Sequence, residues 1–369
     1  MDLLISRSKL FKELQYINGI VERKTTVPIL ANVLLETVGN TLRITVTDLD
    51  VTLRCSCEAA VKVSGTLTVS ARKLFDIVRF APSGAGVHMK AAEGDWMEIS
   101  YDRSRFKLPT LSKSNFPDIG EVSGKTVTLE PSVVRNMISR CVFAITQEES
   151  RYTLNGALAV INKGGLTLVA TDGHRLVLVR RELDLPSMMD EVRVLIPKKA
   201  LVEVLKLASE PVPSLEFGIG EKQLFFKIGE RLLTSRILSG EFPNYEMVVP
   251  KENNRRIVAK TADFIDSLRR VSVLADELTY AVKLSVSEGQ VELSSTNSEV
   301  GQAKETIVVE YKDESVEMGF NAKYLLDFLL VLESEQVVLD LRDSETQGLL
   351  HPHDEGEYLH QYVIMPMSI

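Results

Sequence analysis

One seven-residue pattern recurs three times along the chain at an almost constant interval. Residues 42–48 (LRITVTD) return as residues 166–172 (LTLVATD) and, more weakly, as residues 291–297 (VELSSTN). The aligned threonines lie 124 and then 125 residues apart. This period is longer than that of any solenoid repeat, so each copy should bury a core of its own as a domain.

A second pattern keeps the same order and nearly the same spacing. Residues 69–78, 196–205 and 320–329 each place apolar side chains at i, i+3 and i+4, which is one face of an amphipathic helix. Each also carries a basic residue four positions before an acid, as in Lys199 and Glu203 or Lys323 and Asp327. The pattern predicts helices over 71–80, 198–207 and 322–332, preceded by opening helices near 8–18, 131–143 and 261–274.

Strands should fill the remainder of each copy, so the expected fold class is α+β. Alternating apolar residues bounded by turn residues, as over 41–57, are typical of half-buried strands. The joints between copies are marked by Phe-Pro-Asp at 116–118 and Phe-Pro-Asn at 242–244, 126 residues apart. An element present twice in three copies suits a linker, which gives domains over 1–124, 125–252 and 253–369.

Tandem copies restrict how such a chain can assemble. If the first copy meets the second as the second meets the third, the free faces at the two ends are complementary. Head-to-tail surfaces of this kind either close into a ring or polymerise without limit. We therefore expect two chains to close a ring of six equivalent domains.

Charge is distributed unevenly between the predicted helices and the rest of the chain. The six helical segments together carry a net charge of +7, which leaves −15 for the remainder of a chain whose formal total is −8. Basic helices within an acidic shell favour a surface that attracts phosphate while the rest repels it. Ordinary solvated helix faces would give the same pattern, so charge alone leaves both interpretations open.

The composition excludes several other classes of protein. With 44% hydrophobic and 25% charged residues the chain has the balance of a soluble globular protein, and it contains no apolar run of about 20 residues. Its start has no basic region before an apolar stretch, so no signal peptide is expected. The three cysteines, Cys55, Cys57 and Cys141, suit free thiols in a reducing, cytoplasmic setting.

Several stretches together resemble one known family, the bacterial DNA polymerase III beta subunits or beta sliding clamps. They include TDL at 47–49, RSRF at 103–106, RYTLNG at 151–156, ATDGHRL at 170–176, FPNY at 242–245, GFN at 319–321 and YVIMPM at 362–367. The resemblance implies a head-to-tail dimeric ring with helices lining the hole and antiparallel sheets outside. It also implies a processivity factor without enzymatic activity or cofactor, sliding on duplex DNA without reading its sequence.

The resemblance assigns roles to particular residues. It implies a DNA-facing set comprising Lys24, Arg72, Arg79, Arg135, Tyr152 and Lys198. It implies a hydrophobic peptide-binding pocket between domains 2 and 3 formed by Leu154, Thr171, Gly173, His174, Arg175, Leu176, Pro243, Met247, Val248, Tyr324, Val363, Met365, Pro366 and Met367. Apolar and Met side chains suit an adaptable groove, and Arg175 can orient a peptide carbonyl or carboxylate.

The implied partners are proteins that carry short hydrophobic motifs. They are the DNA polymerase III alpha subunit, the clamp-loader delta subunit, other polymerases, mismatch-repair proteins and ligase. Loading should need an ATP-driven loader, since the chain has no Gly-rich phosphate loop. Met247 stands where relatives commonly have Arg, and residues 347–357 depart from the family pattern.

The implied dimer interface comprises Lys73, Arg103, Arg105, Phe106, Val273, Leu274, Glu299 and Glu305. Gly301 and Lys304 occupy positions that are often acidic in the family. Fewer ion pairs across this interface should make closure depend mainly on apolar packing, so ring stability should vary only weakly with salt.

Three other interpretations fit the sequence less well. Asp172 and His174 lack a nearby nucleophile motif, and Asp48 and Asn297 repeat the position of Asp172, which favours a turn role over catalysis. The histidines at 351, 353 and 360 with Asp354 are more typical of a solvated loop than of a metal site. A peptide-binding adaptor that never touches DNA fits the charge distribution less well.

Overall fold

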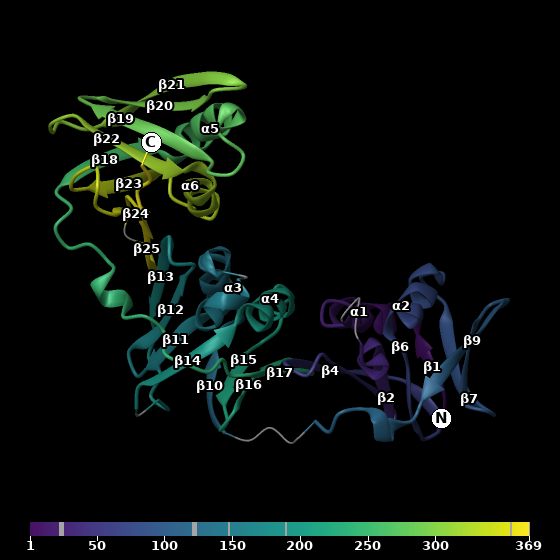
Figure 1. Cartoon of the computed structure of the whole chain (residues 1–369). Coiled ribbons are helices and arrows are strands. Elements are labelled where there is room, and N and C mark those ends of the chain that lie inside the picture. The colour runs from purple at the N-terminus through teal and green to yellow at the C-terminus, as the bar shows by residue number, and fades with distance from the viewer. Residues whose placement is uncertain (22–25, 120–123, 147, 189, 355, 369) are drawn as a thin grey trace. The chain divides into compact units, whose positions relative to one another are not determined.

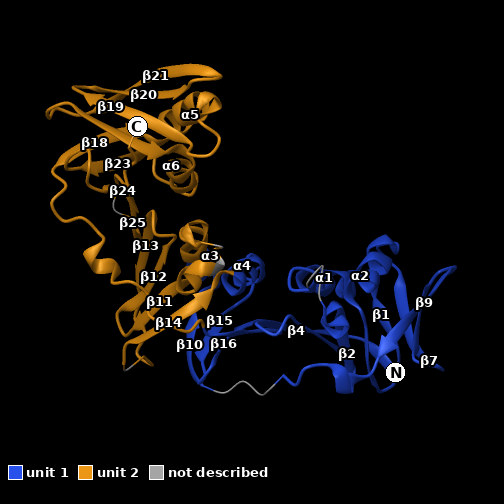
Figure 2. Cartoon of the chain, viewed as in Figure 1, with its two compact units in different colours: residues 1–135, 199–237 blue, residues 136–198, 238–369 orange. Residues whose placement is uncertain are grey.

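The computed structural model describes residues 1–21, 26–119, 124–146, 148–188, 190–354 and 356–368. The chain divides into two compact units, residues 1–135 with 199–237 and residues 136–198 with 238–369 (Figure 2). Within the described residues, every helix is too short or too polar to cross a bilayer.

Unit 1 is built on one 13-stranded sheet with helices packed against it (Figure 1). Two helices lie side by side, with the rings of Phe11 and Phe75 stacked 5.5 Å apart. The strands are β1 (Asp2–Ser6), β2 (Asn32–Val38), β3 (Thr41–Thr47), β4 (Val51–Glu58), β5 (Ala60–Val63), β6 (Thr66–Ser70), β7 (Gly86–Ala92), β8 (Trp96–Tyr101), β9 (Ser104–Leu111), β10 (Lys125–Leu129), β15 (Leu215–Ile219), β16 (Gln223–Ile228) and β17 (Arg231–Arg236). The helices are α1 (Arg7–Ile17), α2 (Ala71–Phe80) and all but the first residue of α4 (Lys198–Leu207).

Unit 2 is built on a 12-stranded sheet, and α3 (Pro131–Ser139) runs into it from unit 1. Its own helices are α5 (Thr261–Val271) and α6 (Ala322–Leu329). The strands are β11 (Gly156–Asn162), β12 (Gly165–Thr171), β13 (Arg175–Glu182), β14 (Val192–Pro197), β18 (Arg255–Lys260), β19 (Ala281–Ser287), β20 (Gln290–Asn297), β21 (Gly301–Glu310), β22 (Val316–Asn321), β23 (Gln336–Leu341), β24 (Gly348–Pro352) and β25 (Tyr358–Ile364).

The six predicted helices are confirmed, although four end one to four residues earlier than expected. The helices α3 and α5 are each followed by a separate 3₁₀ turn, Val142–Ala144 and Ser272–Leu274, where the spacing predicted continuous helix. Side-chain caps explain two of the starts. The hydroxyl of Ser70 accepts a hydrogen bond from the Lys73 amide at α2, and Asn321 Oδ1 accepts one from the Tyr324 amide at α6.

The recurring acid or amide after the repeated strand has the predicted turn role in all three copies. Asp48, Asp172 and Asn297 each accept two backbone N–H bonds through Oδ1. These Asx turns reverse the chain into β4, β13 and β21 respectively. The repeat in sequence is therefore a repeat of one strand–turn–strand unit.

Each unit contains a joint between two copies of the repeat, made by antiparallel pairing of strand edges. In unit 1, β4 pairs with β17, as in Leu53 opposite Leu233. In unit 2, β13 pairs with β25, as in Leu176 opposite Val363. The sheets are continuous across the joints, which is why segment 125–252 contributes strands to both units.

The alternating pattern of β4 buries one face of the strand. Cys55 and Cys57 lie on this buried face, as their i, i+2 spacing predicted, and both are free thiols. Burial raises the pKa of Cys57 to about 12, so the thiol stays neutral near neutral pH. These cysteines fill the core of unit 1.

Candidate functional site

The joint between β13 and β25 carries an apolar cluster of unit 2. Leu176, Val363 and Leu349 on three adjacent strands are each less than a tenth exposed. We call this set the second-joint cluster; it comprises Leu158, Val160, Val169, Leu176, Leu178, Leu195, Tyr245, Leu349 and Val363, with Leu238, Phe242, Val248 and Val249 packed against it.

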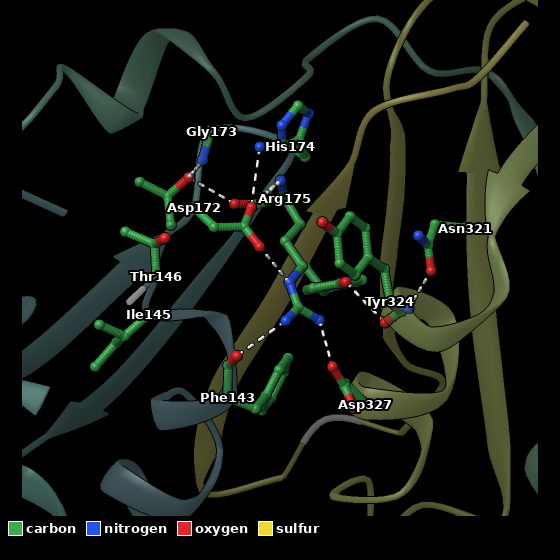
Figure 3. Close-up of polar contacts among 12 residues, drawn as sticks. Phe143, Ile145, Thr146, Asp172, Gly173, His174, Arg175, Asn321, Tyr324 and Asp327 are labelled. Atoms are coloured by element: carbon green, nitrogen blue, oxygen red, sulfur yellow. Dashed lines mark hydrogen bonds and ion pairs between the residues drawn. The ribbon is translucent and has the colours of Figure 1, made fainter. Parts of the chain in front are cut away.

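Arg175, the first residue of β13, is the polar centre beside this cluster (Figure 3). Its Nε donates to Asp172 Oδ2 at 2.9 Å, and its Nη1 to Asp327 Oδ2 of α6 at 2.7 Å. Its Nη2 donates to the Phe143 carbonyl at 2.9 Å, and the guanidinium lies 4.2 Å from the centre of the Tyr324 ring. Each guanidinium nitrogen therefore has a partner within the protein.

The charge of Arg175 is kept in spite of its burial. Burial alone would lower the pKa of this guanidinium, but contacts with Tyr362, Asp327 and Asp172 raise the pKa above its ordinary value. The side chain is 7% exposed, so a cation there is stable only because two carboxylates face it. Arg175 thus fixes β13 to α6.

The turn before Arg175 is held by short polar contacts. The hydroxyl of Thr171 donates to the Arg175 carbonyl at 2.6 Å and accepts from the Gly173 amide. Gly173 has φ +90°, a backbone conformation that residues with a Cβ rarely adopt. The turn therefore needs glycine at this position, and it also leaves His174 exposed on the surface.

The structure brings many of the expected pocket residues together. Leu176, Val248 and Val363 meet in the second-joint cluster, and Tyr324 covers Arg175. The amide of Met365 donates to the His174 carbonyl at 3.0 Å, which continues the strand pairing beyond β25. Leu154 is buried, two residues before Gly156, where β11 begins.

Other expected pocket residues lie at the surface or toward another cavity. Pro243 and Met247 are exposed, Met247 by 81%. Pro366 and Met367 line a separate cavity of about 520 Å³ with Lys283, Glu317 and Gly319. The amide of Met367 donates to the Gly319 carbonyl at 2.8 Å, which holds this end of the chain in place.

The helix acid at the repeated i, i+4 position has a different use from the one its spacing indicated. In α6, Asp327 binds Arg175, whereas the Lys323 ammonium lies 3.3 Å from the Tyr280 ring centre. Sequence reasoning missed Asp327 as part of this site, although its recurrence in three copies was visible. Tyr245 and Leu349 were missed as well, because their burial depends on strands far apart in sequence.

The expected DNA-facing residues are mostly solvent-exposed. Arg72, Arg79, Arg135 and Tyr152 are exposed. Lys198 is half-buried, and its ammonium donates to the Ile145 carbonyl at 2.7 Å. Burial and the nearby Arg175 lower the pKa of Lys198. Lys24 lies outside the described residues.

The expected dimer residues lie on β9, on α2 and around α5. Arg103, Arg105 and Lys73 are exposed, and Phe106 lies 5.6 Å from the Tyr101 ring. Val273 is 77% exposed and Leu274 is half-buried. Glu299 is exposed, but both oxygens of Glu305 are bonded within the chain, to Arg270 and Ser267.

The histidine-containing segment is only partly the solvated loop that its composition indicated, because His353 and Asp354 are exposed between two strands whereas His351 and His360 lie within them. Gly348–Pro352 forms strand β24, in which His351 Nε2 lies 3.1 Å from Asp340 Oδ2. His360 lies in β25 and is 3% exposed. Strand pairing with β23 and β13 overrode the Pro- and Gly-rich local sequence. Among the described residues no three His, Cys, Asp or Glu side chains are grouped to hold a metal.

We expect His360 to make stability fall in mild acid. Burial lowers the pKa of His360 to about 3, whereas the unfolded value is 6.5, so the unfolded state binds more protons between these values. The contribution of neutral His360 to the free energy of unfolding is complete above pH 6.5. It is lost as the pH falls, by about 2 kcal/mol at pH 5. Urea midpoints at pH 7 and pH 5 measure this loss. His360→Leu should flatten the pH dependence, and His353→Leu, at an exposed position, should not; equal slopes in all three proteins would contradict the assignment.

Known proteins match this chain over its whole length. The families of N-terminal, central and C-terminal domains of the DNA polymerase III beta subunit match residues 1–120, 128–244 and 246–368. The beta sliding clamps of Pseudomonas putida and Pseudomonas aeruginosa are 37% and 36% identical to it, covering 100% of both chains.

Solved structures agree with the sequence matches. The sliding clamp of Pseudomonas aeruginosa with a ligand superposes with a TM-score of 0.94 at 35% identity, and the beta sliding clamp of Caulobacter crescentus with 0.94 at 32%, each over 100% of both chains. Three clamp repeats of antiparallel sheet and helix define the class: this is a DNA clamp. More narrowly, the chain belongs to the DNA polymerase III beta subunit family, the beta sliding clamps, and its function is that of a sliding clamp that tethers partner proteins.

Proposed function

We propose that two copies of this chain close head to tail into a ring around duplex DNA, with domains at 1–124, 125–252 and 253–369. One observation carries this proposal. The strands that follow the Asx turns, β4 and β13, are paired by β17 and β25, the last strands of the next copy. The equivalent strands at the two ends of the series are β21 and β9.

These two terminal strands have edges that suit each other. Among the described residues, Gly301–Val308 of β21 pair only with β20, and β18 joins at Val309 and Glu310 alone. Strand β9 pairs with β8 over Ser104–Pro109 but meets β6 only at Thr110 and Leu111. Unpaired strand edges favour pairing with another chain. Pairing of β21 with β9 of a second chain would give both free edges a partner strand. The expected dimer residues flank these two edges.

The exposed cations are proposed to face the enclosed DNA. Arg72 and Arg79 lie on α2 and Arg135 lies on α3, and both helices carry few acids. Tyr152 lies in the segment between α3 and β11. Phosphate contacts of this kind carry no sequence information, so the ring can slide. Retention would then come from enclosure, and the role is that of a non-catalytic, cytoplasmic subunit.

The second-joint cluster with its rim is proposed as the docking site for partner peptides. Tyr324 lies over Arg175, and His174, Met247 and Met365 are exposed, so adaptable and aromatic groups are available to form the proposed rim. A Pseudomonas aeruginosa clamp has been crystallised with griselimycin, a peptide-like ligand. The partners proposed for this site are polymerases including the DNA polymerase III alpha subunit, the clamp-loader delta subunit, mismatch-repair proteins and ligase.

Retention on circular DNA tests the ring. The purified chain is loaded onto nicked circular DNA with a clamp loader, the DNA is linearised, and bound protein is followed by gel filtration. We expect retention on the circle and release after linearisation, because enclosure ends where the DNA has an end. Equal retention on both forms would mean ordinary affinity binding and would refute the ring.

A further inference from the structure

The first joint repeats the strand register of the second joint with different side chains. Residues 32–58 and 156–182 pair identically when shifted by 124 positions: Leu34 faces Thr45 and Thr45 faces Arg54, as Leu158 faces Val169 and Val169 faces Leu178. The three later residues belong to the second-joint cluster. Their counterparts in unit 1 therefore occupy the site equivalent to that cluster.

A linker segment covers this equivalent site as well. Phe116 and Ile119 pack with Leu34, Ile29 and Leu30, as Phe242 and Tyr245 pack in the second-joint cluster. Beneath and beside them lies a cavity of about 570 Å³, which we call the first-joint groove. It is lined by Leu34, Glu36, Arg43, Thr45, Arg54, Lys113, Ser114 and Phe116–Ile119.

Two of the residues that line this groove, Arg43 and Arg54, are cations without a bound counter-ion in the described part of the chain. The buried Nε of Arg54 has no hydrogen-bond partner, and Arg43 no ion pair, among the residues that the structure describes. The nearest acid across the strands, Glu36, is already bound by the Lys113 ammonium at 2.6 Å. Both guanidinium groups are only partly exposed, so a carboxylate bound there would be attracted more strongly than in water.

We propose that the first-joint groove binds a short acidic segment of a partner protein, with its carboxylates on Arg43 and Arg54. An apolar side chain of the segment packs on Leu34, Phe116 and Ile119. This site is additional to the peptide site proposed at the second joint, and it selects partners by charge where that site selects by apolar shape. A DNA backbone would need a continuous basic track, which Glu36 and Asp118 interrupt, whereas a short acidic segment needs only the two guanidinium groups of Arg43 and Arg54.

A peptide-binding measurement on the full-length dimer tests this inference. The probe is a fluorescein-labelled peptide with a Leu-Phe pair flanked on both sides by Asp, and its partner probe has Asn in place of each Asp. Fluorescence anisotropy should show saturable binding of the Asp peptide and weakening by about tenfold or more in Arg43→Gln/Arg54→Gln. Lys90→Gln, an exposed cation on β7 of the same unit, is the matched control and should bind as the wild type does.

Further measurements separate binding at the first-joint groove from misfolding of the double variant and from binding of DNA. Arg43→Gln alone, at a partly exposed side chain, should weaken binding while leaving the melting temperature unchanged, which keeps the test valid if the double variant folds poorly. Equal affinity in wild type and arginine variants, equal affinity for the Asn peptide, or tighter arginine-dependent binding of duplex DNA would each overturn the proposal. The retention assay above is independent of it, so the two can fail separately.

Discussion

Replacing Arg231 with methionine is expected to destabilise unit 1 by about 3–5 kcal/mol, the usual cost of removing one partner from a buried ion pair. Arg231 of β17 donates through Nε and Nη2 to the two carboxylate oxygens of Glu13 on α1, each at 2.7 Å. Both residues are less than a tenth exposed. The variant would leave the Glu13 carboxylate buried without a cation. Urea unfolding followed by circular dichroism measures the loss.

A second arginine on the same strand provides the matched control. Arg236 pairs with Asp50 at 3.5 Å, but both side chains are more than half exposed, so Arg236→Met should leave the urea midpoint nearly unchanged. The double variant Glu13→Leu/Arg231→Met should regain most of the lost stability, because no charge is then buried alone. Equal midpoints for Arg231→Met and Arg236→Met would show that the bidentate pair does not hold β17 to α1.

The sequence predicted the parts of this fold that depend on local spacing. Helical periodicity located all six helices, and the recurrence of Asp48 at Asp172 and Asn297 predicted a turn role that the hydrogen bonds confirm. The helical pattern spans a few residues, whereas the turn position was recognised because it recurs at intervals of 124 and 125 residues. The physical causes of both, helix geometry and Asx hydrogen bonding, are local.

The sequence could not predict which distant partners these local elements choose. Lys199 and Asp327 both occupy the repeated i, i+4 positions on a helix, yet Lys199 binds Asp48 and Asp327 binds Arg175. Two other residues, His351 and His360, belong to strands because β23 and β13 pair with them, against their local composition. Tertiary pairing decided each case, and a single sequence carries no direct signal of it.

An ion pair between a turn and a helix closes each joint, and the two joints place the acid and the base on opposite elements. At the first joint the turn supplies the acid Asp48 and the helix supplies the base Lys199. At the second joint the turn region supplies the base Arg175 and the helix supplies the acid Asp327. The two joints therefore close with ion pairs of opposite polarity between turn and helix.

Replacing Val273 with arginine is expected to convert the dimer to monomers. Val273, Leu278 and Val300 are each more than 60% exposed around the end of unit 2 that the ring proposal pairs with a second chain. The partner surface formed by β9 and the turn before it carries Arg105 and Arg103, so a new cation would be desolvated next to like charges. Such a contact costs several kcal/mol, which corresponds to a dimer dissociation constant raised by about 100-fold or more.

Sedimentation equilibrium of wild type, Val273→Arg and Val63→Arg measures this effect. Val63 is 54% exposed on β5, away from the proposed interface, so its variant should stay dimeric. The wild-type constant should change little between low and moderate ionic strength, because Glu305 is already bonded within its own chain. Loss of the dimer together with loss of retention on circular DNA would tie ring closure to this apolar face. A monomeric wild type, or a Val273→Arg protein as dimeric as the wild type, would place the interface elsewhere.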